Sequence, residues 1–149
     1  MTRRDRAIEY FKSGCNCSQA VTLAFSDLLD VDEKSLAKLS SSFGGGIGRL
    51  REVCGAVSGM CIVAGLLYGF EAGETGSEKA AHYARIQALA HEFEAQNGSI
   101  ICRVLMGLSV KHDAPTPEAR TKEYYAKRPC AEMVGIAAEI LERYLNEQK

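Results

Sequence analysis

The strongest constraint on the fold of this chain is residues 53–70, an uncharged and mostly apolar stretch of eighteen residues. Eighteen residues is the lower limit for a helix that spans a bilayer. Arg49 and Arg51 precede the stretch, however, and the helical patterns elsewhere in the chain are amphipathic. Amphipathic helices need an apolar partner, so we expect this stretch to form a buried central helix and expect no membrane association.

Start and stop signals divide the rest of the chain into further helices. Gly14 ends the first, Asn16 and Gln19 form a capping box that begins the second, and Gly98 ends a long one. No stretch has a convincing strand pattern. We therefore predict an all-α, single-domain bundle of about six or seven helices over residues 1–149. The main expected helices are 3–13, 17–29, 33–42, 53–70, 77–96, 100–106 and 130–146.

Composition excludes several functional classes. The chain has 18 Lys and Arg against 19 Asp and Glu, with a net charge of −1. Nucleic-acid-binding domains are usually strongly basic, so we expect no nucleic-acid partner. The N-terminal segment lacks the apolar core of a signal peptide, which predicts a cytoplasmic protein with reduced thiols. None of the six cysteines forms a C-x-x-C pair, which argues against a thioredoxin-like site or a zinc ribbon.

Four of the six cysteines fall at the start of predicted helices. They are Cys17, Cys54, Cys102 and Cys130. A thiol in the first turn meets unpaired backbone N–H groups and the positive end of the helix dipole, and both lower its pKa. Such a thiol tends to be a thiolate at neutral pH, the form that attacks disulfides and binds metals. We expect the four cysteines to line one cavity, with Cys17 and Cys54 within bridging distance. Repulsion between thiolates there would be relieved by a retained proton, a disulfide or a metal.

The two remaining cysteines carry weaker signals. Cys61 lies in the middle of the apolar helix, where a cysteine usually serves as a small core residue. It stands about 10 Å from Cys54 along the helix axis, which is too far for a disulfide. Any partner of Cys54 must therefore come from another helix. Cys15 is either an additional resolving thiol or a neighbour of Cys17 with no special role.

A glycine-rich segment, FGGGIGR over residues 43–49, precedes Cys54. Such a loop is either flexible or tightly wound, and its amides either bind an anion or allow close backbone packing. The candidate cofactor-binding residues here are Gly44, Gly45, Gly46 and Arg49. Arginines close to the cysteines either stabilise thiolates and anionic ligands or are solvated at the surface. They are Arg49, Arg51, Arg103 and Arg128.

Short motifs around the four cysteines resemble those of a known family. The motifs are NCSQA around Cys17, CGAVSG from Cys54, GSIICRVLMG around Cys102 and RPCAEMV around Cys130, with FGGGIGR before the second. Together they resemble the C_GCAxxG_C_C family of redox-active proteins, over about residues 10–140. The resemblance implies that these four cysteines are the signature thiols, and that Cys15 and Cys61 lie outside the signature.

Three functions remain open at this point. The first is thiol–disulfide redox chemistry with Cys17 and Cys54 as the reactive pair, in a thiol-dependent oxidoreductase or an electron-transfer component. The second is a thiolate-bound metal or an iron–sulfur cluster, with ligands from Cys17, Cys54, Cys102 and Cys130. The third is a non-catalytic helical module whose cysteines fill space. We expect a redox partner protein and leave a homodimer open.

Overall fold

The computed structural model describes residues 1–109 and 112–149, and the regular structure of these residues is helical. The all-α prediction is confirmed, with eight α-helices in the described ranges where about six or seven were expected. They are α1 (Arg3–Lys12), α2 (Cys17–Leu23), α3 (Glu33–Ser40), α4 (Gly55–Tyr68), α5 (Ser77–Asn97), α6 (Cys102–Leu105), α7 (Lys122–Lys127) and α8 (Cys130–Glu147). Two short 3₁₀ helices, η1 (Ser26–Leu28) and η2 (Ser41–Phe43), flank α3.

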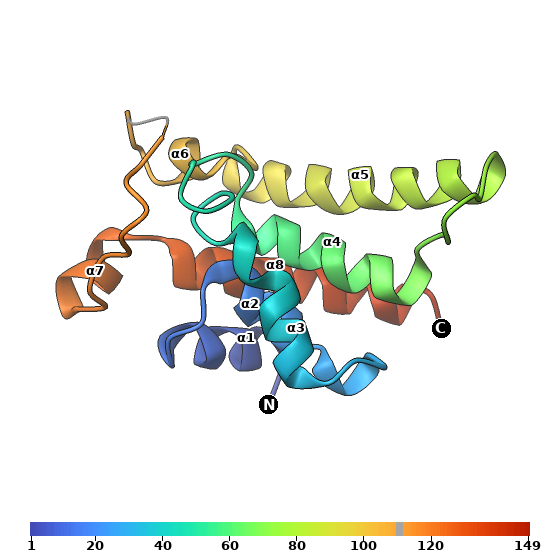
Figure 1. Cartoon of the computed structure of the whole chain (residues 1–149), viewed down its shortest axis with the longest axis horizontal. Helices are drawn as coiled ribbons and strands as arrows, with labels where there is room; N and C mark the ends of the chain where they lie inside the picture. Colours follow the sequence, from blue (N-terminus) through green and yellow to red (C-terminus); the bar gives the residue numbers. More distant parts are fainter. Residues whose placement is uncertain (110–111) are drawn as a thin grey trace.

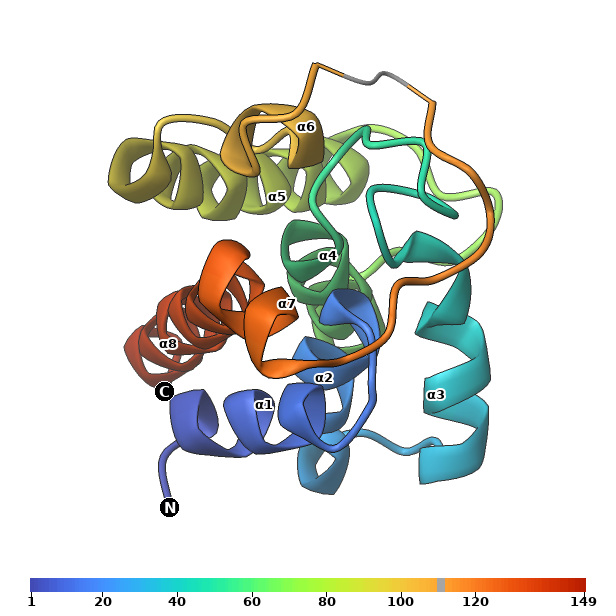
Figure 2. The ribbon, with the colours of Figure 1, turned by 90° about the vertical axis from the view of Figure 1, so that its left-hand side faces the viewer.

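Helix α4 lies in the middle of the bundle. Viewed from the end, it stands between α5 and α2, with α8 beside it (Figure 2). Helix α1 packs against both α2 and α8, and α3 packs against α2. Helices α4 and α8 begin at the same end of the molecule and run in the same general direction (Figure 1). This arrangement brings several helix starts to one end of the bundle.

The prediction that the apolar stretch forms a buried helix is not confirmed in full. Helix α4 is shorter than residues 53–70, and only part of its surface is enclosed. Met60 and Val63 are completely buried, whereas Leu66 is 44% exposed. Because α5 and α8 cover α4 only in part, its second half keeps apolar surface in contact with solvent. No helix in the described ranges is long and apolar enough to cross a membrane.

Close packing between α2 and α4 depends on glycine. A Cβ atom at Gly59 would lie 2.8 Å from the Cβ of Val21 and 3.0 Å from the carbonyl oxygen of Ser18. A Cβ atom at Gly55 would lie 3.1 Å from the Cβ of Cys17. These distances are at or below the closest normal contacts, so the two helices approach to a separation that only glycine permits. The first turns of α2 and α4 are therefore held together.

Helix α2 begins as predicted and ends earlier than predicted. Asn16 Oδ1 accepts a hydrogen bond from the backbone N–H of Gln19, and Gln19 Oε1 accepts one from the N–H of Asn16. This confirms the capping box. The helix ends at Leu23 rather than near residue 29, because the chain turns tightly after Ala24 and buries the ring of Phe25.

Candidate functional site

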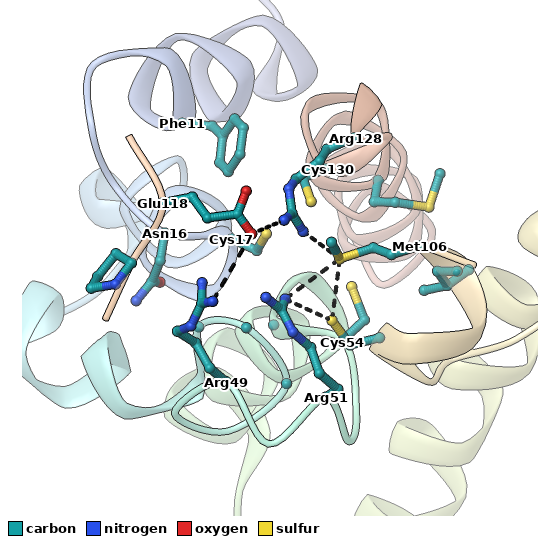
Figure 3. A pocket seen from close by; sticks show the side chains of 18 of the residues that line it. Phe11, Asn16, Cys17, Arg49, Arg51, Cys54, Met106, Glu118, Arg128 and Cys130 are labelled. Carbon is teal, nitrogen blue, oxygen red and sulfur yellow. Dashed lines mark hydrogen bonds and ion pairs between the residues drawn. The ribbon is translucent and has the colours of Figure 1, made fainter. Parts of the chain in front are cut away.

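A cavity of about 400 Å³ lies at the end of the bundle where several helices begin. All four cysteines predicted at helix starts line it: Cys17, Cys54, Cys102 and Cys130. They reach it from α2, α4, α6 and α8, and Figure 3 shows Cys17, Cys54 and Cys130 pointing into the same space. Cys15 and Cys61 are not among the residues that line this cavity. The fold thus gathers residues that are more than 100 positions apart in sequence.

Each of the four cysteines is placed by the start of its helix, but in different ways. Cys17 and Cys130 are the first residues of α2 and α8. Cys54 is the N-cap of α4, and Cys102 opens α6, which has only four residues. A helix this short has almost no dipole, so the helix-start argument is weak for Cys102.

Cys54 and Cys102 are held close by a backbone pairing that the sequence did not reveal. The N–H of Cys54 donates to the carbonyl of Ile100 at 2.7 Å, and the N–H of Cys102 donates to the carbonyl of Glu52 at 2.6 Å. These bonds form an isolated antiparallel bridge between Val53 and Ile101. Cys54 and Cys102 each follow one of the two bridged residues, so their side chains lie on the same face of this pairing. Both thiols are thereby directed towards the cavity.

Helix α6 begins later than the helix expected over residues 100–106. It starts only at Cys102, with Ile101 as its N-cap. The hydroxyl of Ser99 accepts a hydrogen bond from the N–H of Ile101. The bridge with residue 53 holds Ile101 in an extended conformation, which delays the helix.

The glycine-rich loop is tightly wound rather than flexible. Gly46, Ile47 and Arg49 all have positive φ angles, and successive backbone hydrogen bonds close the loop on itself. A Cβ atom at Gly44 would lie 2.4 Å from the side chain of Asn16, and one at Gly46 would lie 2.8 Å from the Cβ of Cys102. The glycines thus make room for elements that carry the thiols. Gly44, Gly45, Gly46 and Arg49 all line the cavity, and their role in binding a cofactor stays a prediction.

Cys17 and Cys130 form the most strongly interacting pair of thiols. The Cys17 thiol donates a hydrogen bond to the sulfur of Cys130, which lowers the pKa of Cys130 to about 7, against opposition from burial. The positive charges of Arg128, Arg51 and Arg120 lower it further. The same hydrogen bond, together with burial, raises the pKa of Cys17 well above its ordinary value. At pH 7 about half of the molecules therefore carry one negative charge on this pair, held mainly on Cys130.

The other thiols of the cavity are not thiolates at neutral pH. Burial raises the pKa of Cys54 to about 12, although hydrogen bonds from the backbone of Ala56 and Val57 oppose this rise. Burial also raises the pKa of Cys102, against the opposing influence of Arg51. The lowered pKa that a helix start favours is therefore absent at Cys54 and Cys102, where desolvation outweighs the helix start, and at Cys17, where the hydrogen bond with Cys130 is the largest cause.

Three of the four arginines singled out in the sequence reach the cavity. Arg49, Arg51 and Arg128 line it, whereas Arg103 instead pairs with Glu52 at 3.2 Å. The side chain of Arg51 is only 4% exposed and forms an ion pair with Asp113 at 2.9 Å. Its Nη1 atom lies 3.6 Å from the sulfur of Cys102. The expectation of solvated surface arginines is therefore wrong for Arg51.

Two charged residues of the cavity were missed by sequence reasoning. Glu118 and Arg120 precede α7, and both line the cavity. Glu118 forms an ion pair with Arg128 and points between Arg128 and Arg49 (Figure 3). Arg120 donates to the carbonyl oxygens of Phe11 and Cys15, each at 3.0 Å. Thr116 and Pro117 predict a helix start just before these residues, but α7 begins only at Lys122, so this prediction is wrong and it did not place either residue in the cavity.

The donor set was also tested for a metal site. Among residues 1–109 and 112–149, no group of three or more His, Cys, Asp or Glu side chains is arranged to hold a metal ion. Within these residues the four cysteines of the cavity are therefore not arranged as a metal or iron–sulfur site.

Comparison with known proteins gave one match. A family model described as "Putative redox-active protein (C_GCAxxG_C_C)" matches residues 15–144. The match therefore includes the four cysteines of the cavity and most of the helical bundle. Searches of curated proteins and of solved structures gave no match.

Proposed function

This chain belongs to the C_GCAxxG_C_C family of redox-active proteins, and we propose that it performs thiol–disulfide exchange as a thiol-dependent oxidoreductase. In this proposal Cys130 is the attacking thiolate and Cys17 is the resolving thiol. The observation that carries it is the placement of both thiols on one arginine-lined cavity, where the Cys17 thiol lowers the pKa of Cys130. A resolving thiol must be able to reach the attacking sulfur, and Cys17 lines the same cavity as Cys130.

The acidity of Cys130 supports its role as the attacking group. Disulfide exchange requires a thiolate, and an attacking thiol is most effective when its pKa is near the ambient pH. The pKa of Cys130 is about 7, lowered first by the hydrogen bond from Cys17 and then by Arg128. The sequence alone favoured Cys17 with Cys54, but the pKa of Cys54, raised to about 12 by burial, makes it a poor nucleophile.

The reaction proceeds in two exchange steps. The Cys130 thiolate attacks one sulfur of a substrate disulfide, which forms a mixed disulfide and releases the first substrate thiolate. Cys17 then gives up its proton and attacks the sulfur of Cys130, which closes a Cys17–Cys130 disulfide and releases the second thiolate. One proton from Cys17 and one from solvent convert the two released thiolates to thiols at neutral pH. One dithiol is oxidised while one substrate disulfide is reduced, so atoms and electrons balance.

The same features count against a module in which all the cysteines only fill space. A space-filling cysteine is normally buried in apolar surroundings, where its pKa is raised, as burial raises that of Cys61. Cys130 has the opposite environment, because Cys17 and three arginines stabilise its thiolate. The space-filling interpretation suits Cys61 and does not suit Cys130.

The proposal is tested by reacting the reduced protein with bis(2-hydroxyethyl) disulfide, a small neutral disulfide. The wild-type chain should release two molecules of 2-mercaptoethanol and acquire a Cys17–Cys130 disulfide, identified by peptide mass spectrometry. Cys17→Ser should release only one molecule and retain a mixed disulfide on Cys130. Cys61→Ser, which changes a thiol outside the cavity, should behave as the wild type.

Two results would contradict the proposal. The first is a mapped disulfide that joins another pair of cysteines in the wild-type chain. The second is release of two thiol molecules by Cys17→Ser, because another residue would then act as the resolving thiol. Circular dichroism of each variant shows that the fold is retained, so that a loss of reaction cannot arise from unfolding.

A further inference from the structure

The cavity carries more positive than negative charge. Four arginines line it: Arg49, Arg51, Arg120 and Arg128. The carboxylates that form ion pairs with them are Asp113 and Glu118. Even with Cys130 as a thiolate, the arginines outnumber the negative groups. Stabilisation of one thiolate therefore does not account for all the positive charge, and a cavity of this kind attracts anions.

The guanidinium groups of Arg51 and Arg128 both point at the sulfur of Met106, which is a weak hydrogen-bond acceptor. Nη1 of Arg51 lies 3.6 Å from the sulfur of Met106, and Nη1 of Arg128 lies 3.5 Å from the same atom (Figure 3). A thioether sulfur is a weak acceptor, whereas buried guanidinium groups normally bind carboxylate or phosphate oxygens. Both donors therefore have spare capacity for an oxygen atom of a ligand.

Arg120 adds a further positive charge to the cavity. Its guanidinium carbon stacks over the rings of Phe11 and Tyr124, at 4.4 and 5.0 Å from their centres. Its hydrogen bonds go to backbone carbonyls, and within residues 1–109 and 112–149 it forms no ion pair with a carboxylate. The charge of Arg120 is therefore balanced only by dipoles and ring faces, which leaves it able to attract an anion.

The size of the cavity indicates an organic ligand. A volume of about 400 Å³ lies within the range that small organic molecules occupy and greatly exceeds the need of a simple oxyanion. Much of the wall between the arginines is apolar. The apolar lining includes Phe11, Leu105, Met106, Pro115, Pro117 and Met133. A molecule that fits must combine a negatively charged group with a short apolar body.

We infer that the substrate of the proposed exchange reaction is a small organic disulfide that carries a carboxylate. This inference rests on the proposed function. The carboxylate binds the Nη1 groups of Arg51 and Arg128, and the disulfide lies against Cys130. The products are the two thiols formed from its arms, at least one of which bears the carboxylate, and the Cys17–Cys130 disulfide, by the two exchange steps given above. Glu118 already pairs with Arg128, so it competes with the substrate carboxylate for this arginine.

Three disulfides with short, similar arms and different charges test the inference. They are 3,3′-dithiodipropionate, bis(2-hydroxyethyl) disulfide and cystamine, which are anionic, neutral and cationic. Each rate constant with the reduced protein is divided by that for free dithiothreitol, which removes intrinsic differences between the disulfides. At low salt we expect the normalised rate of the anionic disulfide to exceed that of the cationic one at least ~10-fold. Added salt should reduce this ratio.

Variants separate ligand recognition from thiolate stabilisation. Arg128→Gln should slow all three reactions, because Cys130 loses a stabilising charge, and should also lower the anionic-to-cationic ratio about threefold. Arg128→Lys should restore most of the ratio. Glu118→Gln should raise the ratio, because it removes the competing carboxylate. Arg143→Gln, which removes the same charge from the exposed far part of α8, should leave the ratio unchanged.

The outcomes distinguish the inference from the proposed function. If the neutral disulfide does not oxidise the protein at all, thiol–disulfide exchange itself is excluded. If the neutral disulfide reacts and the normalised ratio is near one, exchange stands and the carboxylate site is wrong. The same conclusion follows if both Arg128→Gln and Glu118→Gln leave the ratio unchanged. If Arg143→Gln lowered the anionic-to-cationic ratio as much as Arg128→Gln does, only the net charge of the protein would matter, and the carboxylate site would again be wrong.

Discussion

Cys130 and Cys54 stand at the starts of α8 and α4, and the comparison between them separates two influences on a thiol. Cys54 receives backbone hydrogen bonds from the first turn of its helix, yet burial raises its pKa to about 12. The pKa of Cys130 is lowered to about 7 by the hydrogen bond from Cys17 and by nearby arginines. In this molecule a helix start places a thiol, while its neighbours decide whether it ionises.

The difference in pKa predicts that Cys130 is alkylated much faster than Cys54. At pH 7, a thiol with a pKa of about 7 is about half ionised, while one with a pKa of about 12 is ionised in about one molecule in 100,000. The thiolate of lower pKa is the weaker nucleophile, which offsets part of this advantage. We expect Cys130→Ser to slow the fastest alkylation by iodoacetamide at least ~100-fold, and Cys54→Ser to leave it nearly unchanged. Site-resolved mass spectrometry measures both rates, and equal losses in the two variants would refute the distinction.

The burial of Cys54 depends on the close contact between α2 and α4, which Gly59 permits. Gly59→Ala would place a Cβ atom 2.8 Å from that of Val21, so the helices must separate. We expect a loss of ~1–3 kcal/mol in the free energy of unfolding, together with faster alkylation of Cys54. Chemical denaturation measures the first effect and mass spectrometry the second.

Gly65 provides the matched control on the same helix. A Cβ atom there would have no neighbour within 4 Å, so Gly65→Ala meets no obstacle and should stabilise α4 by ~0.5–1 kcal/mol. If Gly59→Ala were as stable as Gly65→Ala, the contact between α2 and α4 would not determine the environment of Cys54.

The sequence was informative where a structural signal is local. The capping box of Asn16 and Gln19 depends on residues three apart, and it placed Cys17 at the first position of α2. Pro129 and Gly98 marked helix boundaries within one or two residues for the same reason. The convergence of the four cysteines could also be proposed, since each belongs to a helix start. Local hydrogen bonds and backbone preferences carry this information.

The acidity of each thiol could not be predicted in the same way, because it depends on residues distant in sequence. Arg128 lies two positions before Cys130, but the largest influence on its thiol comes from Cys17, 113 positions earlier, and further charges come from Arg51 and Arg120. Gly55 and Gly59 indicate that a helix packs closely beside Cys54, but not that this helix is α2. The positions of the thiols are therefore local properties, whereas their chemistry is a property of the fold.

Alkaline pH should affect stability through Cys54. Its folded-state pKa is raised from 9.0 to about 12, so the folded state favours the protonated thiol. The stabilisation is complete below pH 9 and is lost as pH rises towards 12, because only the unfolded thiol ionises in this range. At pH 10 the loss should be about 1 kcal/mol. Denaturation of the wild type and Cys54→Ala at pH 8 and pH 10 measures it, and an identical decrease in both chains would exclude Cys54 as the cause.

The acidity of Cys130 should depend on the hydrogen bond from Cys17. Cys17→Ala removes the donor and leaves the arginines in place, so the pKa of Cys130 should rise part of the way towards its ordinary value. The pH profile of Cys130 alkylation, with a midpoint near 7 in the wild type, should shift to higher pH, and the rate at pH 7 should fall about fivefold. Cys61→Ala makes the same chemical change outside the cavity and should keep the wild-type midpoint. An unshifted midpoint in Cys17→Ala would mean that the arginines alone make Cys130 a thiolate, and Cys17 would then keep only its role as the resolving thiol.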